Sequence, residues 1–207
     1  MQFKKILFFL CICVSVNACK EVDPNKQFDE GNYKDQLYVS KEIGWQLKVP
    51  KGWEIITKSQ KDDYSQKGKK VFKDVHDMDV DDSSVKDLIA FKKDKYNIFL
   101  SNSESFKETY EGEWKESSAN LKSILYDTYK SKGINVDSMA TITERIDGLD
   151  FERIGFVIYG SDGEVILNQL YYRKLINGVA FNVILNYNNE KDKRIMQDAL
   201  FSSKFRK

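Results

Sequence analysis

Four aspartates in the stretch HDMDVDDSS, residues 76–84, are the first candidates for chemistry in this chain. Three of them match the first, third and fifth positions of a calcium-binding loop: Asp77, Asp79 and Asp81. That loop also needs glycine at its sixth position and a bidentate glutamate at its twelfth, where this chain has Asp82 and Leu88. The sequence therefore predicts a solvated acidic loop rather than an EF-hand, with a weak, irregular Ca²⁺ contact as the alternative.

Residues for catalysis are scarce. The chain has a single histidine, His76, so neither a His-based triad nor a multi-His metal site can be assembled. It contains no G-x-S-x-G, no Gly-rich phosphate loop and no zinc-type spacing. Adjacent carboxylates such as Asp62 and Asp63 are common on solvated surfaces. We therefore predict a protein that is not an enzyme, without catalytic residues, cofactor or resident metal. A carboxylate or serine hydrolase is the weakest alternative, and no residue can be nominated for it.

Cys19 has the most specific predicted chemistry. It follows two early lysines and an apolar run from Ile6 to about Val16, the layout of a secretory signal too short to cross a bilayer as a mature helix. The sequence VNAC, residues 16–19, resembles the lipobox of bacterial lipoproteins. That resemblance implies removal of residues 1–18 as a signal peptide, a diacylglycerol on the Cys19 thiol and acylation, for example with palmitate, of the new amino terminus. The alternatives are an ordinary signal peptide that contains a cysteine, or an uncleaved anchor helix.

Composition limits the partners and the domain count. With 33 Lys and Arg against 32 Asp and Glu, the chain has no basic field, so we predict no nucleic-acid partner. Residues 19–36 are polar and contain Pro24 and Gly31, and they are predicted to be the lipidated cysteine and a flexible tether. The remaining residues 37–207 are predicted to form one globular domain, because 41% of the chain is hydrophobic.

The hydrophobic periodicity predicts strands, a long helix, an antiparallel meander and a closing helix. Period-two alternation around Pro50–Gly52 indicates a hairpin or a tight bend. An apolar stripe at three- and four-residue steps predicts a helix over about 111–132, ended by Gly133. The other predicted elements are a short helix at 63–74, strands at 88–93 and 96–102, meander strands at 140–146, 151–160, 165–175 and 179–187, and a last helix capped by Asn188 or Asn189. The predicted class is α+β, an antiparallel sheet flanked by helices.

Several segments together resemble the PsbP-like superfamily, over roughly residues 37–206. They are IGWQLKVPKGWEI at 43–55, the central amphipathic helix, GVAFNVILNYN at 178–188 and LFSSKF at 200–205. The resemblance implies an α/β/α sandwich that works as an assembly or binding factor on a larger complex rather than as a catalyst. No motif here matches the metal-associated or partner-contacting residues of particular members, so none is transferred.

Aromatic and basic residues suggest a binding surface. The predicted set is Trp45, Trp53, Trp114, Tyr171 and Arg173, with burial in the core as the alternative for the two early tryptophans. We predict a lipid-anchored bacterial cell-envelope protein, held at a membrane through its N-terminal lipid, that acts as a non-catalytic binding or assembly module on an envelope protein partner. The alternative is a carrier or sensor of a small apolar or amphipathic ligand in a pocket between sheet and helix.

Overall fold

Two antiparallel sheets form the framework of the computed structural model, which describes residues 22–206. The larger, nine-stranded sheet has the order β4-β6-β7-β12-β11-β10-β8, with β5 paired to β7 and β9 paired to β10. Its strands are β4 (Glu54–Ile55), β5 (Lys86–Asp87), β6 (Phe91–Lys92), β7 (Ile98–Ser105), β8 (Asn135–Ser138), β9 (Ile142–Ile146), β10 (Leu149–Tyr159), β11 (Val165–Ile176) and β12 (Val179–Tyr187). The predicted meander is confirmed as β9 to β12.

The smaller sheet brings together the two ends of the described chain. Its order is β1-β2-β3-β13, made of β1 (Asn32–Lys34), β2 (Leu37–Val39), β3 (Trp45–Lys48) and β13 (Lys204–Phe205). Strand β3 belongs to this sheet and β4 to the larger one, so the Pro50–Gly52 segment is a bend between sheets and not a hairpin turn.

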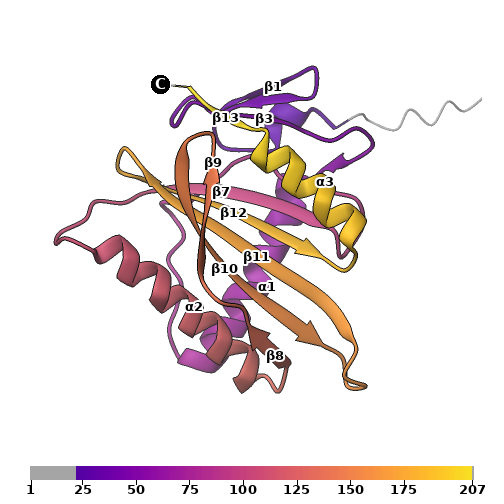
Figure 1. The fold of residues 1–207 in the computed structure, drawn as a ribbon, viewed down its shortest axis with the longest axis vertical. Coiled ribbons are helices and arrows are strands. Elements are labelled where there is room, and N and C mark those ends of the chain that lie inside the picture. Colours follow the sequence, from indigo (N-terminus) through magenta and orange to yellow (C-terminus); the bar gives the residue numbers. More distant parts are fainter. Residues whose placement is uncertain (1–21, 207) are drawn as a thin grey trace, which may run out of the picture.

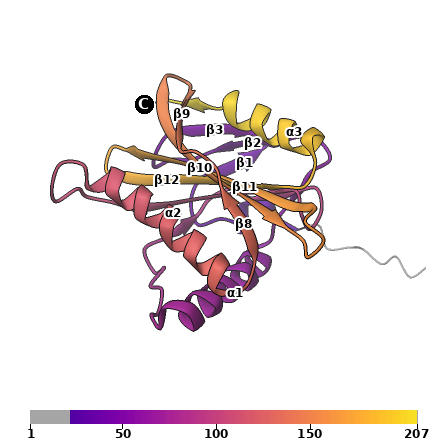
Figure 2. The same cartoon turned by 60° about the horizontal axis from the view of Figure 1, so that its bottom comes forward.

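Helices cover both faces of the larger sheet (Figures 1 and 2). Helices α1 (Lys58–His76) and α2 (Glu113–Ser131) lie on one side, whereas α3 (Glu190–Phe201) and the smaller sheet lie on the other. Two predicted helix ends are confirmed. Gly133 follows α2 with a positive φ of 71°, and the Asn189 side chain accepts a hydrogen bond from the Asp192 backbone N–H at the start of α3. The predicted α+β class, with an antiparallel sheet flanked by helices, is confirmed.

Alternation along the strands sends side chains into two apolar layers. In β12, one face carries Phe181, Val183 and Leu185, which pack with Met196 and Leu200 of α3. The other side of the sheet packs under α2, where Val136, Phe156 and Ile158 meet the half-buried aromatic residues of the helix. Burying each large apolar side chain contributes about 1.5–3 kcal/mol to folding, so these layers position both helices.

The prediction of a flexible tether is wrong for most of residues 19–36. A 3-10 helix, η1, spans Pro24–Lys26, and β1 begins at Asn32. Between them, Phe28 is buried in the main core and contacts Tyr38 edge-on at 5.1 Å between ring centroids. The polar composition concealed this because only two apolar side chains attach the segment to the core, the buried Phe28 and the half-buried Tyr33. Residues 1–21, including Cys19 and the predicted signal peptide, lie outside the described residues.

Helix α1 is longer than predicted and is poorly packed. Of its 19 residues only Lys61 is buried, and its central residues 62–68 are exposed. Ion pairs hold it instead, joining α1 lysines to carboxylates of neighbouring segments: Lys58 to Asp29, Lys61 to Asp87, Lys69 to Asp82 and Lys73 to Asp79. A helix that is polar nearly all round needs such contacts because it has little apolar area to bury.

Candidate functional site

The five predicted surface residues fall on opposite faces of the larger sheet. Trp45 is 0% exposed in the main core, where its indole N–H donates to Ser203 Oγ at 3.0 Å. Its prediction as a binding residue is therefore wrong, and the core alternative holds. Trp53 is half-buried and packs edge-on against Phe91 with ring centroids 5.7 Å apart. Only Trp114, Tyr171 and Arg173 lie together, on the α2 side.

Arg173 is the most unusual residue in this group. It is only 6% exposed, and no carboxylate lies within ion-pair distance of it among residues 22–206. Its Nε donates to Asn182 Oδ1 at 3.0 Å, one terminal nitrogen donates to Ser118 Oγ at 2.8 Å, and the guanidinium lies 4.6 Å from the centre of the Trp114 ring. Burial lowers the pKa of Arg173, opposed by the more distant charges of Glu152 and Glu104. A buried guanidinium whose hydrogen-bond partners are neutral is costly, because its charge is removed from water without a paired anion.

Strand register explains how the Arg173 contacts arise. Four cross-strand partners form one row across the sheet: Asn102 of β7, Asn182 of β12, Arg173 of β11 and Glu152 of β10. Asn182 also donates to Asn102 Oδ1 at 2.9 Å, which extends the chain of hydrogen bonds across three strands. The sequence analysis did not select these asparagines. The local pattern held no signal for them, since a polar residue that alternates with apolar ones, as Asn182 does, is typical of a solvated strand face.

A hollow of about 440 Å³ opens beside this row, between α2 and strands β8 to β10. Its walls are Lys115, Ala119, Lys122, Ser123, Tyr126, Ser138, Thr141 and Glu152. Lys122 Nζ donates to the Met139 carbonyl oxygen at 2.6 Å and so fastens α2 to the segment that joins β8 and β9. The exposed lining is mainly apolar, and its charged residues are Lys115, Lys122 and Glu152, so the hollow suits a small molecule with an apolar body and a polar group.

We expect two substitutions of Arg173 to distinguish the contribution of its packing to stability from the contribution of its charge. Arg173→Ala should lower the free energy of unfolding by about 2–4 kcal/mol, because it leaves a cavity and removes the partners of Asn182 and Ser118. Arg173→Met should cost less than half as much, since it fills the space and removes a desolvated charge. Urea unfolding checks this, with Arg145→Ala on the exposed edge as a control within about 0.5 kcal/mol of the parent protein. Equal losses for the alanine and methionine variants would show that the polar contacts dominate.

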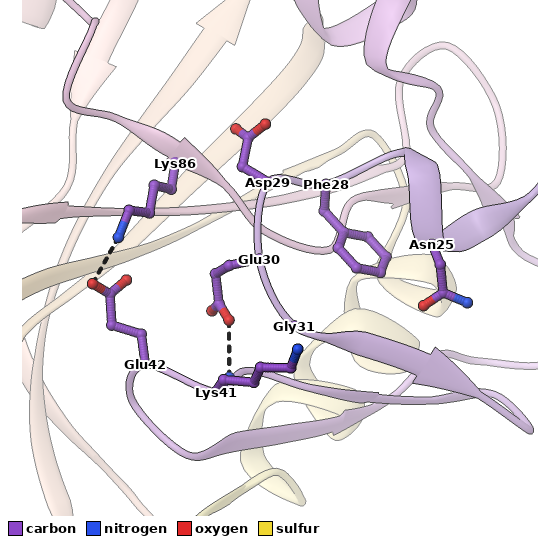
Figure 3. Close-up of a pocket in the computed structure, with 8 residues that line it drawn as sticks. All are labelled: Asn25, Phe28, Asp29, Glu30, Gly31, Lys41, Glu42 and Lys86. Atoms are coloured by element: carbon purple, nitrogen blue, oxygen red, sulfur yellow. Dashed lines mark hydrogen bonds and ion pairs between the residues drawn. The ribbon is translucent and has the colours of Figure 1, made fainter.

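A second hollow, of about 420 Å³, lies beside the N-terminal segment (Figure 3). It is lined by Asn25, Phe28, Asp29, Glu30, Gly31, Lys41, Glu42 and Lys86. Most of its charges are already engaged: Lys86 Nζ lies 2.8 Å from Glu42 Oε1, Asp29 pairs with Lys58, and Glu30 Oε2 accepts the Lys41 backbone N–H at 2.9 Å. Burial raises the pKa of the Asp29 carboxyl, but hydrogen bonds and the charge of Lys58 outweigh this and lower it overall. These contacts stabilise the segment and leave little capacity for a charged ligand.

The acidic stretch 76–84 is occupied by the lysines of α1. Asp79 pairs with Lys73, Asp82 pairs with Lys69, and Asp81 Oδ1 accepts the backbone N–H of Ser83. His76 shares a hydrogen bond of 2.8 Å with Thr128 of α2. Within residues 22–206, no group of three or more His, Cys, Asp or Glu side chains is placed to hold a metal ion. The same residues include no helix that is both long and apolar enough to span a membrane.

Comparison with known proteins supports the architecture. No protein-family model matches the chain, and no curated protein is similar to it in sequence. Among solved structures, the solution structure of cyanobacterial PsbP (CyanoP) from Synechocystis sp. PCC 6803 covers 83% of this chain and 92% of its own, with a TM-score of 0.55 and 12% sequence identity. The fold is PsbP-like. The predicted resemblance is therefore confirmed for the fold. At 12% identity, this similarity shows the fold alone and does not identify functional residues in this chain.

Proposed function

We propose that this chain is a lipid-anchored protein of the bacterial cell envelope whose PsbP-like domain binds an envelope complex as a non-catalytic accessory or assembly factor. The VNAC sequence at residues 16–19 carries the proposal, because Cys19 follows the apolar run of a signal sequence directly. The fold supports it, since a PsbP-like domain is compatible with a binding module. The contacts of His76 with Thr128 and Phe72 support it too, because they give this histidine a structural role.

Helix α1 is the surface that we assign to the partner. Its exposed middle carries Tyr64 and, two turns later, Val71, which are 38% and 37% exposed. The segment after α1 adds exposed Met78 and Val80, and the ion pairs of Asp79 and Asp82 hold this segment along the helix. A partner that covers this mixed apolar and charged surface would give α1 the packing that it lacks within the domain.

Crosslinking and affinity purification of the tagged full-length protein from intact envelopes test this function. We expect one envelope complex to be recovered from the parent protein and lost in both Cys19→Ala and the double variant Tyr64→Ala/Val71→Ala. The matched control is Val165→Ala/Ile166→Ala, because these side chains are also exposed, at 48% each, but lie on β11. Recovery of the complex with the α1 variant would contradict docking through α1.

The hollow beside α2 favours a second candidate function. Its mainly apolar walls and the lysines that line it, Lys115 and Lys122, suit a carrier or sensor of a small amphipathic molecule. If no complex is recovered, native mass spectrometry of the mildly extracted protein distinguishes this candidate. An added mass that Lys115→Met removes would support it, because Lys115 lines the hollow, and the bare lipoprotein would contradict it.

A further inference from the structure

We propose that the end of the domain formed by η1 and the smaller sheet faces the lipid surface, and that a short tether holds the domain in this one orientation. The inference rests on the lipidation of Cys19 in the proposed function. It identifies which surface of the domain meets the bilayer and which surface remains accessible to a protein partner.

The covalent distance from Cys19 to the fold is short. The Asp23 side chain accepts a hydrogen bond from the Asn25 backbone N–H at 3.0 Å, so Asp23 already belongs to the folded domain. Only Lys20, Glu21 and Val22 separate it from Cys19. At about 3.6 Å per residue, four chain steps span at most about 14 Å. A tether of seventeen flexible residues would have allowed a root-mean-square separation of about 20–25 Å.

The segment behind this attachment is held firmly. The Asn25 side chain donates to the Tyr33 carbonyl at 2.9 Å and accepts the Tyr33 N–H at 2.7 Å, which occupies the edge of β1. Asp29 accepts the Asp87 N–H at 2.8 Å and pairs with Lys58 at 2.7 Å. Phe28 adds the apolar anchor described above. A pull on Cys19 is therefore transmitted to both sheets.

Charge does not supply the orientation. Residues 22–48 and 204–206, which form this end, contain five lysines and one arginine against five carboxylates. A nearly neutral surface has no attraction to anionic lipids of the kind that a polybasic segment has. The tether alone must therefore hold this end at the bilayer. We expect the unlipidated domain not to bind vesicles.

The size of the domain and the position of its helices determine which surfaces lie away from the bilayer. A domain of this length has a diameter of about 40 Å, well beyond the reach of the tether. The smaller sheet lies at one end of the molecule, and α2 with β8 lies at the opposite end (Figures 1 and 2). The hollow beside α2 is therefore held away from the lipid surface, together with the C-terminal end of α1, where His76 contacts Thr128 of α2. A protein partner can reach the exposed surface of α1 there.

Energy transfer on the lipidated full-length protein tests the orientation. No cysteine follows Cys19, so a cysteine introduced into the acylated protein is the only thiol available to a donor dye. Lys26→Cys reports on exposed η1, and Ser161→Cys reports on the exposed turn beyond β10, next to β8. In phosphatidylcholine and phosphatidylglycerol vesicles with a headgroup acceptor, we expect severalfold more efficient transfer from position 26. Equal transfer, or more from position 161, would overturn the proposal.

An insertion variant separates the tether from other causes. About twenty Gly and Ser residues placed between Val22 and Asp23 should abolish most of the difference between the two positions, because this linker alone spans about 25 Å. A difference that survives the insertion would overturn the role of the tether. Mass spectrometry of the amino terminus reads lipidation independently. An unlipidated terminus refutes the proposed function, whereas a lipidated protein with equal transfer refutes only the orientation.

Discussion

Replacing Trp45 by alanine will lower the free energy of unfolding by about 3–5 kcal/mol, a large part of the stability of a domain of this size. The indole is fully buried between the two sheets. It lies 4.7 Å from the Phe181 ring centroid and 5.9 Å from that of Tyr38, so its loss empties a space that neither sheet can fill. It also leaves the Ser203 hydroxyl without its donor.

Urea unfolding followed by circular dichroism measures the effect of Trp45→Ala without relying on tryptophan fluorescence. Trp53→Ala is the matched control, because it removes the same side chain from a half-buried position at the edge of the core. We expect the control to lose less than half as much stability. Similar losses for the two variants would contradict the central role of Trp45 in joining the sheets.

Replacing Cys19 by alanine is expected to abolish stable membrane association of the processed protein. Each acyl CH₂ buried in a bilayer contributes about 0.8 kcal/mol, so losing two or three chains removes on the order of 10 kcal/mol or more of membrane affinity. Fractionation after an alkaline wash, with mass spectrometry of the amino terminus, measures this. We expect either release of the protein or retention of the uncleaved residues 1–18.

Cys13→Ala provides the control for the Cys19 variant. It removes another thiol from the predicted signal, six residues before Cys19, and should leave both processing and fractionation unchanged. If processed Cys19→Ala protein stayed in the membrane as the parent does, the lipid anchor would be refuted, and an ordinary signal peptide would be the better interpretation.

Much of the fold could be predicted because its elements are locally consistent. The strands of the meander are long, alternate in polarity and are separated by Asp147-Gly148 and Asn177-Gly178, whose aspartate, asparagine and glycines all adopt positive φ. Helix α2 carries a continuous apolar stripe. By contrast, strands such as β4, β5 and β13 are only two residues long, and no periodicity can be detected over two positions.

The candidate site was less predictable, because it depends on which face of a strand is covered. Arg173 and Trp114 were selected for their types, but the sequence could not reveal that they would meet beneath α2 while Trp45 became core. Asn102 and Asn182 lie 80 residues apart, and the register of β7, β12 and β11 alone brings Asn182 against both Asn102 and Arg173. Register is a long-range property that the local pattern does not specify.

The sequence by itself determined the α+β class, the order of the meander and its flanking helices, and the prediction of a lipid anchor at Cys19, because each follows from a local pattern of polarity or from one short motif. Only the tertiary structure decided that the residues from Pro24 onward belong to the fold and that α1 is left with little packing. It also decided that Arg173 is buried with no carboxylate partner among residues 22–206. These features depend on contacts between distant segments: Phe28 with Tyr38, lysines with carboxylates, and α2 with the sheet.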